Sequence, residues 1–198
     1  WVSGNAWVYG DAKVSGNAQV SGNAQVSGNA QVYGDAQVSG NAQVYGDAWV
    51  YGDAWVYGDA WVYGDAQVSG NAQVYGYAWV SGYAWVSGNA WVYGDAKVYG
   101  NAQVSGNTQV YGNAQVSGDA WVENRTDWLL VGPAKSSGRF TTAYRDKEIG
   151  VRVSCGCFSG TVKEFSTSIE ETHADNAEYL SQYRIFCQLI AANFGVTE

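Results

Sequence analysis

The sequence is poor in proline, histidine and cysteine, with one, one and three of these among 198 residues, and it contains no methionine. Its 10 Lys and Arg are outnumbered by 18 Asp and Glu, so the net charge of -8 excludes a nucleic-acid surface built on clustered cations. No apolar run of about 18 residues is present, which excludes a membrane-spanning helix. The few, odd-numbered cysteines do not make a disulfide framework and favour a reducing compartment.

Leucine, isoleucine and phenylalanine are absent from residues 1–120, which form twenty consecutive hexapeptides without an insertion. Each hexapeptide reads x-Val-[Ser/Tyr]-Gly-[Asn/Asp/Tyr]-Ala, with Thr108 as the one departure at the sixth position. The first position is Trp eight times, Gln ten times and Lys twice. The chain does not open with a signal peptide, and Trp1 lies inside the repeat pattern, so we expect upstream sequence, including any leader, to be missing.

The hexapeptide predicts short strands joined by tight turns. Valine and alanine alternate with larger or polar residues, so they share one face of a strand, and Gly-Asn or Gly-Asp turns the chain every six residues. A helix does not tolerate a glycine and a β-branched valine in every six residues, and a hairpin meander needs longer strands. The remaining solution is a coil, in which each strand stacks on the strand one turn earlier at about 4.8 Å.

The spacing of Val and Ala, from Val2 with Ala6 to Val116 with Ala120, resembles the hexapeptide-repeat left-handed β-helix. That family implies a β-solenoid with three hexapeptides per triangular turn, hence about seven coils and a column roughly 32 Å long. A flattened two-sided solenoid is the alternative, and the right-handed exceptions of the family have the same sequence pattern.

With turns of 18 residues, like positions lie above one another on the outside of the column. One such file contains Tyr57, Tyr75, Tyr93 and Tyr111, and a second places Trp61 over Trp79. A third file alternates Trp49, Gln67, Trp85, Gln103 and Trp121. We interpret these files first as ladders that stabilise parallel strands. The competing interpretation is a flat binding surface of exposed aromatic side chains.

If a binding site exists, we expect it in the turn 49–66, which has three Trp and three Tyr around its girdle. The candidate binding residues are Trp49, Tyr51, Trp55, Tyr57, Trp61 and Tyr63. Corner carboxylates, such as Asp35 with Asp53 and Asp47 with Asp65, are predicted to be vertical neighbours. Because a calcium site needs six or more oxygen ligands, we interpret them as solvated turn residues.

The composition changes after Trp121, since every Leu, Ile and Phe lies beyond it. We predict a β-helix over 1–121, a junction over 122–127 and a small α+β capping or assembly domain over 128–198. The last part is predicted as βββαα, docked on the final coil. Its strands are one at 128–131 and a hairpin of 139–145 with 148–157. The first helix begins at a capping box of Thr161 with Glu164. The second begins at a capping box of Asp175 with Glu178 and ends at Gly195.

This C-terminal segment resembles the one that ends hexapeptide-repeat proteins of bacteriophage and prophage genomes. The resemblance rests on Gly132-Pro133, Thr142-Ala143-Tyr144, Gly156 to Thr161, Glu170 to His173 with Asp175-Asn176, and Tyr183-Arg184. It implies a phage origin, with the host cytoplasm as the favoured location and the virion or the extracellular space as alternatives. It implies no catalytic residue.

The residues do not favour an enzyme. Hexapeptide acyltransferases use a histidine base, and the related zinc carbonic anhydrases need three histidine ligands, but the repeats contain no histidine. Cys155 and Cys157 are predicted to face the same side of one strand, and with Cys187 and His173 they have the wrong spacing for a zinc site. We therefore expect no metal and no cofactor. An anion site at 159–161, where a strand meets a helix N-terminus, is the weaker alternative to simple capping.

Two classes of function remain. We expect a non-enzymatic phage-type scaffold that binds a protein or assembles with itself as a homo-oligomer, because aromatic faces and open strand edges associate readily. The alternative is a glycan- or surface-binding module. Ice binding ranks low within it, because Trp and Tyr interrupt the files of Ser. A degenerate acyltransferase-like protein is the third reading.

Overall fold

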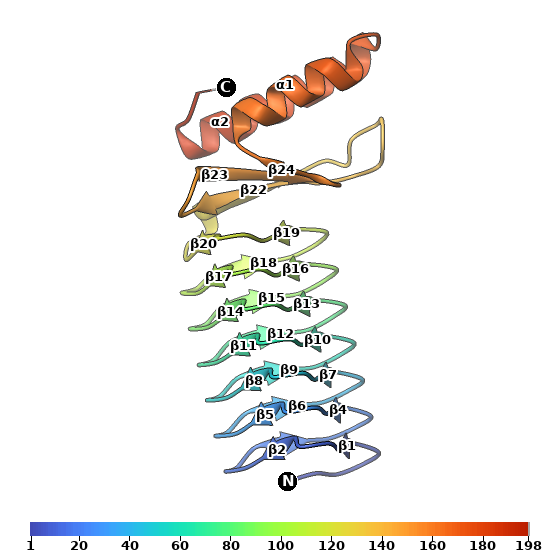
Figure 1. Cartoon of the computed structure of the whole chain (residues 1–198), viewed down its shortest axis with the longest axis vertical. Helices are drawn as coiled ribbons and strands as arrows, with labels where there is room; N and C mark the ends of the chain where they lie inside the picture. Colours follow the sequence, from blue (N-terminus) through green and yellow to red (C-terminus); the bar gives the residue numbers. More distant parts are fainter. Residues whose placement is uncertain (198) are drawn as a thin grey trace.

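The computed structural model describes residues 1–197 as a triangular column of short strands with an α+β domain stacked on its C-terminal end (Figure 1). The first face of the column is the sheet of β1 (Trp7–Val8), β4 (Gln25–Val26), β7 (Gln43–Val44), β10 (Trp61–Val62), β13 (Trp79–Val80), β16 (Lys97–Val98) and β19 (Gln115–Val116). The second face is the sheet of β2 (Lys13–Val14), β5 (Gln31–Val32), β8 (Trp49–Val50), β11 (Gln67–Val68), β14 (Trp85–Val86), β17 (Gln103–Val104) and β20 (Trp121–Val122). The third face is the sheet of β3 (Gln19–Val20), β6 (Gln37–Val38), β9 (Trp55–Val56), β12 (Gln73–Val74), β15 (Trp91–Val92) and β18 (Gln109–Val110).

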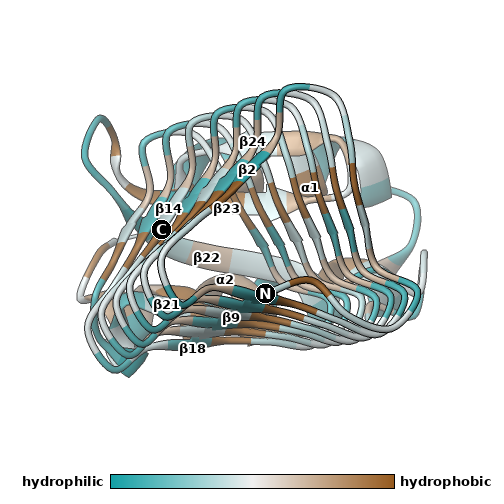
Figure 2. Ribbon diagram, turned by 90° about the horizontal axis from the view of Figure 1, so that it is seen from below, coloured by the Kyte–Doolittle hydropathy of each residue, from teal (hydrophilic) through white to brown (hydrophobic). Residues whose placement is uncertain are grey.

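Neighbouring strands of each face are parallel and 18 residues apart, as in the pairing of Trp61 with Trp79. The predicted β-solenoid is thus confirmed, and the two-sided alternative is wrong because the strands form three sheets of seven, seven and six strands. The column contains between six and seven turns. Seen from its N-terminal end, the chain passes from the first face to the second and then the third anticlockwise as it recedes, which is a left-handed coil (Figure 2).

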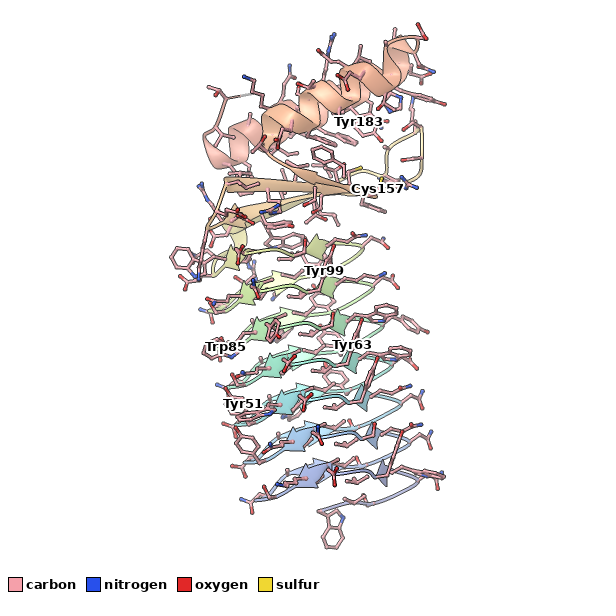
Figure 3. The ribbon with its side chains drawn as sticks, viewed as in Figure 1. Tyr51, Tyr63, Trp85, Tyr99, Cys157 and Tyr183 are labelled. Carbon is pink, nitrogen blue, oxygen red and sulfur yellow. The ribbon has the colours of Figure 1, made fainter. Side chains whose placement is uncertain are left out.

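The predicted inside and outside of the column are also confirmed. Every valine and alanine from Ala18 to Val122 is fully buried, whereas Tyr51, Tyr63 and Trp85 project from the column (Figure 3). Each corner of the column needs its glycine. For example, Gly28 has a φ of +68°, and a Cβ there would lie 3.0 Å from the backbone N and O of Gly46 in the next coil. Strain and collision together exclude other residues at this corner.

The corners next to the glycines carry ladders of amides and carboxylates. Asn17 Nδ2 donates to Asp35 Oδ1 at 2.9 Å, and Asn29 Nδ2 donates to Asp47 Oδ1 at 2.9 Å. These carboxylates therefore accept hydrogen bonds from the turn below. Residues 1–197 include no group of three or more His, Cys, Asp or Glu placed to hold a metal ion.

The C-terminal domain has four antiparallel strands where three were predicted. In chain order its elements are the 3-10 helix η1 (Arg125–Asp127), β21 (Trp128–Val131), β22 (Thr141–Asp146), β23 (Gly150–Cys155), β24 (Phe158–Gly160), α1 (Val162–His173) and α2 (Ala177–Phe194). The missed strand arises because Gly156, with a φ of +61°, turns the chain back after Cys155. Neither helix is long and apolar enough to cross a membrane.

The ends of the helices confirm one predicted cap and correct another. Thr161 and Glu164 form the expected capping box at α1, and Gly195 ends α2 with a φ of 66°. The N-cap of α2 is Asn176 rather than Asp175, and its Oδ1 accepts the backbone N–H of Tyr179 at 3.1 Å. Asn176 has the extended backbone that a cap requires. The sequence alone does not decide between Asp175 and Asn176, because both residue types are good N-caps.

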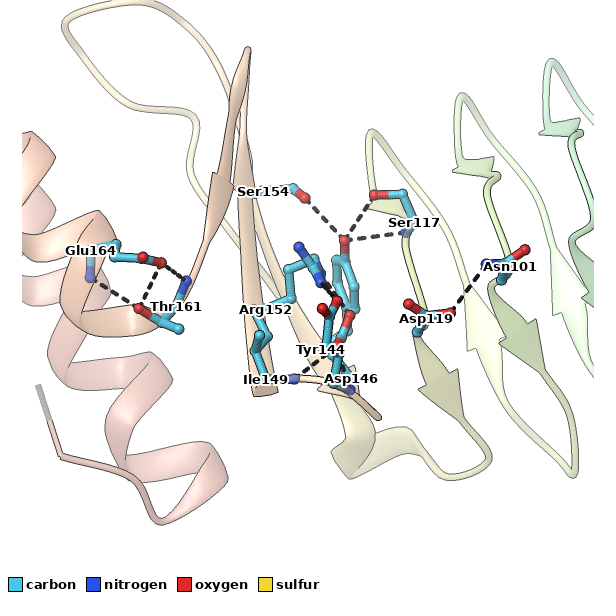
Figure 4. Close-up of polar contacts among 11 residues, drawn as sticks. Asn101, Ser117, Asp119, Tyr144, Asp146, Ile149, Arg152, Ser154, Thr161 and Glu164 are labelled. Atoms are coloured by element: carbon cyan, nitrogen blue, oxygen red, sulfur yellow. Dashed lines mark hydrogen bonds and ion pairs between the residues drawn. The ribbon is translucent and has the colours of Figure 1, made fainter.

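The domain contacts the C-terminal end of the column (Figure 4). The buried Tyr144 hydroxyl lies 3.0 Å from Ser117 Oγ and 3.1 Å from Ser154 Oγ, and it accepts the Ser117 N–H at 3.2 Å. Thr142 Oγ1 accepts the Gln115 N–H at 2.9 Å. Two backbone N–H groups along β19 in the last turn, otherwise open to another chain, are thereby satisfied by side chains of β22.

An ion pair between the buried Asp146 and the partly buried Arg152 stiffens the same junction. Arg152 Nε donates to Asp146 Oδ2 at 2.6 Å, and the backbone N–H groups of Glu148 and Ile149 donate to Asp146 Oδ1. Burial alone would raise the pKa of Asp146, but these hydrogen bonds outweigh it and hold the pKa below its ordinary value. The hairpin that contacts the last turn is therefore fixed by charge as well as by packing.

Candidate binding faces of the solenoid

The six candidate binding residues of the turn 49–66 lie on three different faces. Trp49 and Tyr51 are on the second face, Trp55 and Tyr57 on the third, and Trp61 and Tyr63 on the first. The structure therefore brings them together around the girdle of the column but not on one surface. A flat partner can touch two of these residues at once, and the belt as a single site stays a prediction.

Tyrosines on the column stack on one another from turn to turn. Ring centroids are 4.8 Å apart for Tyr57 with Tyr75 and 5.0 Å apart for Tyr75 with Tyr93, and the rings are nearly parallel. Burial raises the pKa of Tyr57 and, together with the neighbouring tyrosines, that of Tyr75. Because the ring faces are used between turns, these files are ladders that stabilise the column, as the first interpretation predicted.

Two of the three tryptophans of the first face are occupied in a similar way, whereas Trp7 in the first turn is exposed. Trp61 and Trp79 lie on adjacent turns with centroids 5.3 Å apart and rings 6° from parallel. The Lys97 ammonium lies 4.6 Å from the centre of the Trp79 ring, on the next turn. Trp79 is thus held between an indole and a cation. It also lines a hollow of about 470 Å³, in which Lys97 places a cation.

The second face differs, because each tryptophan there has glutamines as its neighbours in the sheet. Gln67 pairs with Trp49 on one side and with Trp85 on the other. The exposed fractions of Trp49, Trp85 and Trp121 are 39%, 43% and 46%. Two of the indoles contact the preceding turn: Trp85 Nε1 donates to Ser69 Oγ at 3.0 Å, and Trp49 meets Tyr33 edge-on. The result is a file of similarly placed, exposed indoles on every second turn.

A hollow of about 460 Å³ lies on this file at Trp49, between its neighbouring glutamines and the corner. Its floor is Gln31, Trp49 and Gln67, and its edge is the preceding corner of the column, with Asn29, Asp47, Asp65 and Tyr83. Tyr83 occupies a corner position that is otherwise Asn or Asp on this edge, and 69% of its surface is exposed. An aromatic floor with carboxylate and amide groups at the rim is typical of a binding site for a ligand with both apolar and hydroxyl surface.

Other hollows lie outside this file, and two of them involve the C-terminal domain and its junction with the column. One, of about 430 Å³, lies where the third face meets the C-terminal domain, with Tyr111, Trp128 and Arg125 among its lining residues. The other, of about 270 Å³, lies within the domain and includes Cys155, Cys157 and His173.

The residues considered for a zinc site share a hollow in part, but within residues 1–197 they form no group of three or more placed to hold a metal ion. Cys155 ends β23, whereas Cys157 is exposed in the turn after it, so the prediction that both share one face of a strand is wrong. Cys187 is buried in α2. His173 stacks on Tyr183 with centroids 5.1 Å apart.

The proposed anion position at residues 159–161 is filled from within the chain. Glu164 Oε2 accepts the Thr161 N–H at 2.8 Å and the Thr161 hydroxyl at 2.9 Å. The backbone N–H of Thr161, followed by its hydroxyl, lowers the pKa of Glu164. Capping therefore accounts for this helix N-terminus.

Comparison with known proteins agrees with the coil. The family model described as YdcK Beta solenoid repeat matches residues 18–34, 24–40, 30–46, 36–52, 42–58, 66–82 and 108–124. Successive windows within 18–58 are offset by six residues, which is the hexapeptide period. The chain is a β-solenoid repeat protein, similar to that family in these segments. A search of curated proteins found no significant match.

Proposed function

We propose that the chain is a non-enzymatic interaction scaffold, in which a rigid column presents tryptophans at fixed intervals and the C-terminal domain closes its end. The observation that carries this proposal is the alternation of exposed Trp with Gln along the second face. Single exposed aromatic residues are common on proteins, whereas an ordered file of them marks an interaction surface.

The chemistry of the described residues supports a scaffold rather than an enzyme. The twenty strands of the column follow one another at a constant interval, so no inserted loop surrounds a substrate pocket. His173 packs against a tyrosine ring, and no group of metal-ligating side chains gathers in residues 1–197. The resemblance of the C-terminal segment is the support for a phage-type role, with a protein or a second copy of the chain as partner.

Light scattering tests the scaffold through self-association. We expect the mass of the wild-type chain to rise above that of a monomer with concentration, because exposed indoles are enriched in interface cores. The variant W49Q/W85Q/W121Q should remain monomeric, whereas W61Q/W79Q, which removes indoles that already stack on each other, should behave as wild type. Equal association of all three proteins would contradict a role for the file in self-association. A wild-type chain that stays monomeric would exclude a second copy of the chain as the partner.

A further inference from the structure

The second face has the chemistry to recognise a particular class of ligand, an inference that rests on the proposed scaffold function. We propose that this face binds a neutral β-1,4-linked polysaccharide chain lying along the column axis. Trp49 and Trp85 stack on every second sugar, and the corner residues Asp47, Asp65 and Tyr83 bind its edge.

The interval between the tryptophans carries the proposal. Trp49 and Trp85 are separated by two steps of a parallel ladder, through Gln67. Two such steps amount to about 9.6 Å. In an extended β-1,4-linked chain successive sugars are flipped, so the same apolar ring face recurs once per disaccharide, a length close to two steps. The Trp-Gln-Trp order therefore places an aromatic ring under alternate sugars and an amide under those between.

The indoles of this file are available, in contrast to Trp61 and Trp79 of the first face. Trp49 and Trp85 have only glutamines beside them in the sheet, and about two fifths of each is exposed at 39% and 43%. Apolar C–H groups of a sugar ring pack on an indole through dispersion and the ring quadrupole. Trp61 and Trp79 of the first face use their rings on each other.

The rim of the hollow supplies partners for hydroxyl groups. Asp47 and Asp65 are acceptors, and Asn29 and Gln31 carry both donors and acceptors, all lining the same space as Trp49. No lysine or arginine lines this hollow, and the chain has a net charge of -8. Anionic polysaccharides are thus repelled, which selects a neutral chain. Tyr83 stands at the edge as a side wall.

The C-terminal end of the file is partly closed by the terminal domain. Lys147 Nζ lies 5.7 Å from the centre of the Trp121 ring and donates to Gln103 Oε1 at 3.1 Å. The open part of the site therefore extends from Gln31 to Trp85. The third face repeats the interval once, at Trp55 and Trp91, but its corner there bears Asp and Asn instead of a tyrosine.

Calorimetry with cellohexaose tests the proposal on the full chain. We expect W49Q/W85Q to bind at least about tenfold more weakly than wild type, whereas the matched control W61Q/W79Q should bind equally well. Gln already occupies this position in ten repeats, so both variants should fold, which circular dichroism checks. Affinity should rise steeply from cellobiose to cellohexaose, and maltohexaose, whose α-1,4 links curve the chain, should not bind.

A variant with relocated tryptophan tests the spacing itself. In Q67W/W85Q the number of indoles on the face is unchanged, but the two nearest lie on adjacent turns. We expect its affinity for cellohexaose to fall as far as that of W49Q/W85Q. Wild-type affinity in this variant, or in W49Q/W85Q, would overturn the proposal, as would binding of maltohexaose with equal strength.

Failure of the polysaccharide site is distinguishable from failure of the scaffold. If cellohexaose does not bind but the file variant abolishes self-association, the ligand class is wrong and the scaffold function stands. If cellohexaose does not bind and the wild-type chain is also monomeric at every concentration, both proposals are overturned.

Discussion

The column and the C-terminal domain reach a buried core by opposite routes. The column repeats one pair, valine and alanine, so any turn makes the same contacts as the next. The domain assembles unlike residues, among them Phe165, Tyr183 and Ile190, each at a unique position. Trp128 and Tyr144 belong to the domain in sequence but pack into the core of the column. Periodicity thus specifies the column, and individual contacts specify the domain and its seat.

The largest expected effect breaks the column at a single point. Val62→Asp places a charge in a narrow dry core where valines and alanines are fully buried, and it should cost several kcal/mol and abolish the solenoid. Circular dichroism and thermal melting measure this loss. Gln25→Asp, on the exposed side of the same face, is the control. Melting of Val62→Asp like wild type would mean that the inside and outside of the column are reversed.

A smaller effect tests whether the two regions unfold together. Tyr144→Phe removes the hydroxyl that joins Ser117 of the last turn to Ser154 of β23 and leaves buried polar groups without their partner. We expect a loss of about 1–3 kcal/mol and a separation of the melting curve into two transitions. Calorimetry checks both, with Tyr99→Phe on the exposed surface as the control. A single unshifted transition would show that packing alone couples the regions.

The pH dependence of stability should distinguish the domain from the column. The folded-state pKa of Asp146 is below its ordinary value, so its contribution is complete above the unfolded carboxyl pKa of about 3.9 and is lost as the pH falls through the lower folded value. We expect Asp146→Asn to lower the melting temperature near pH 7 and to reduce its fall between about pH 4 and pH 2. If the melting temperatures of the two proteins change with pH in the same way, the ion pair does not contribute to the pH dependence of stability.

The smallest effect is a gain within the column. Thr108 stands where all the remaining repeats have alanine, and its fully buried Oγ1 has no hydrogen-bond partner in the described chain. We expect Thr108→Ala to raise the free energy of unfolding by about 1 kcal/mol, measured by denaturant titration. Ala102→Thr, the reverse change one repeat earlier, should lower it. A loss of stability in Thr108→Ala would mean that the extra methyl group fills a real gap.

Much of the fold could be predicted because the repeat determines the coil, its core and the files at 18-residue intervals. The domain was harder, since β24 depends on one turn at Gly156 and the cap of α2 depends on a choice between Asp175 and Asn176. The seating of Tyr144 against Ser117 has no local signal. For the candidate site, the sequence predicted both the Trp-Gln alternation and the stacking of Trp61 on Trp79. It did not predict the hollow beside Trp49, because that hollow depends on how the corner side chains lie relative to the indole.

The strict interval of the corner glycines also governs how such a chain can change its length. Since Gly28 packs against Gly46 and every turn repeats this contact, the gain or loss of 18 residues would preserve every file and merely lengthen or shorten the column. The gain or loss of six residues would also preserve the corners, but it would shift all later residues to the next face and rotate the terminal domain by a third of a turn. The effect of a duplication therefore depends on its length, and only a duplication of whole 18-residue turns keeps each surface file continuous.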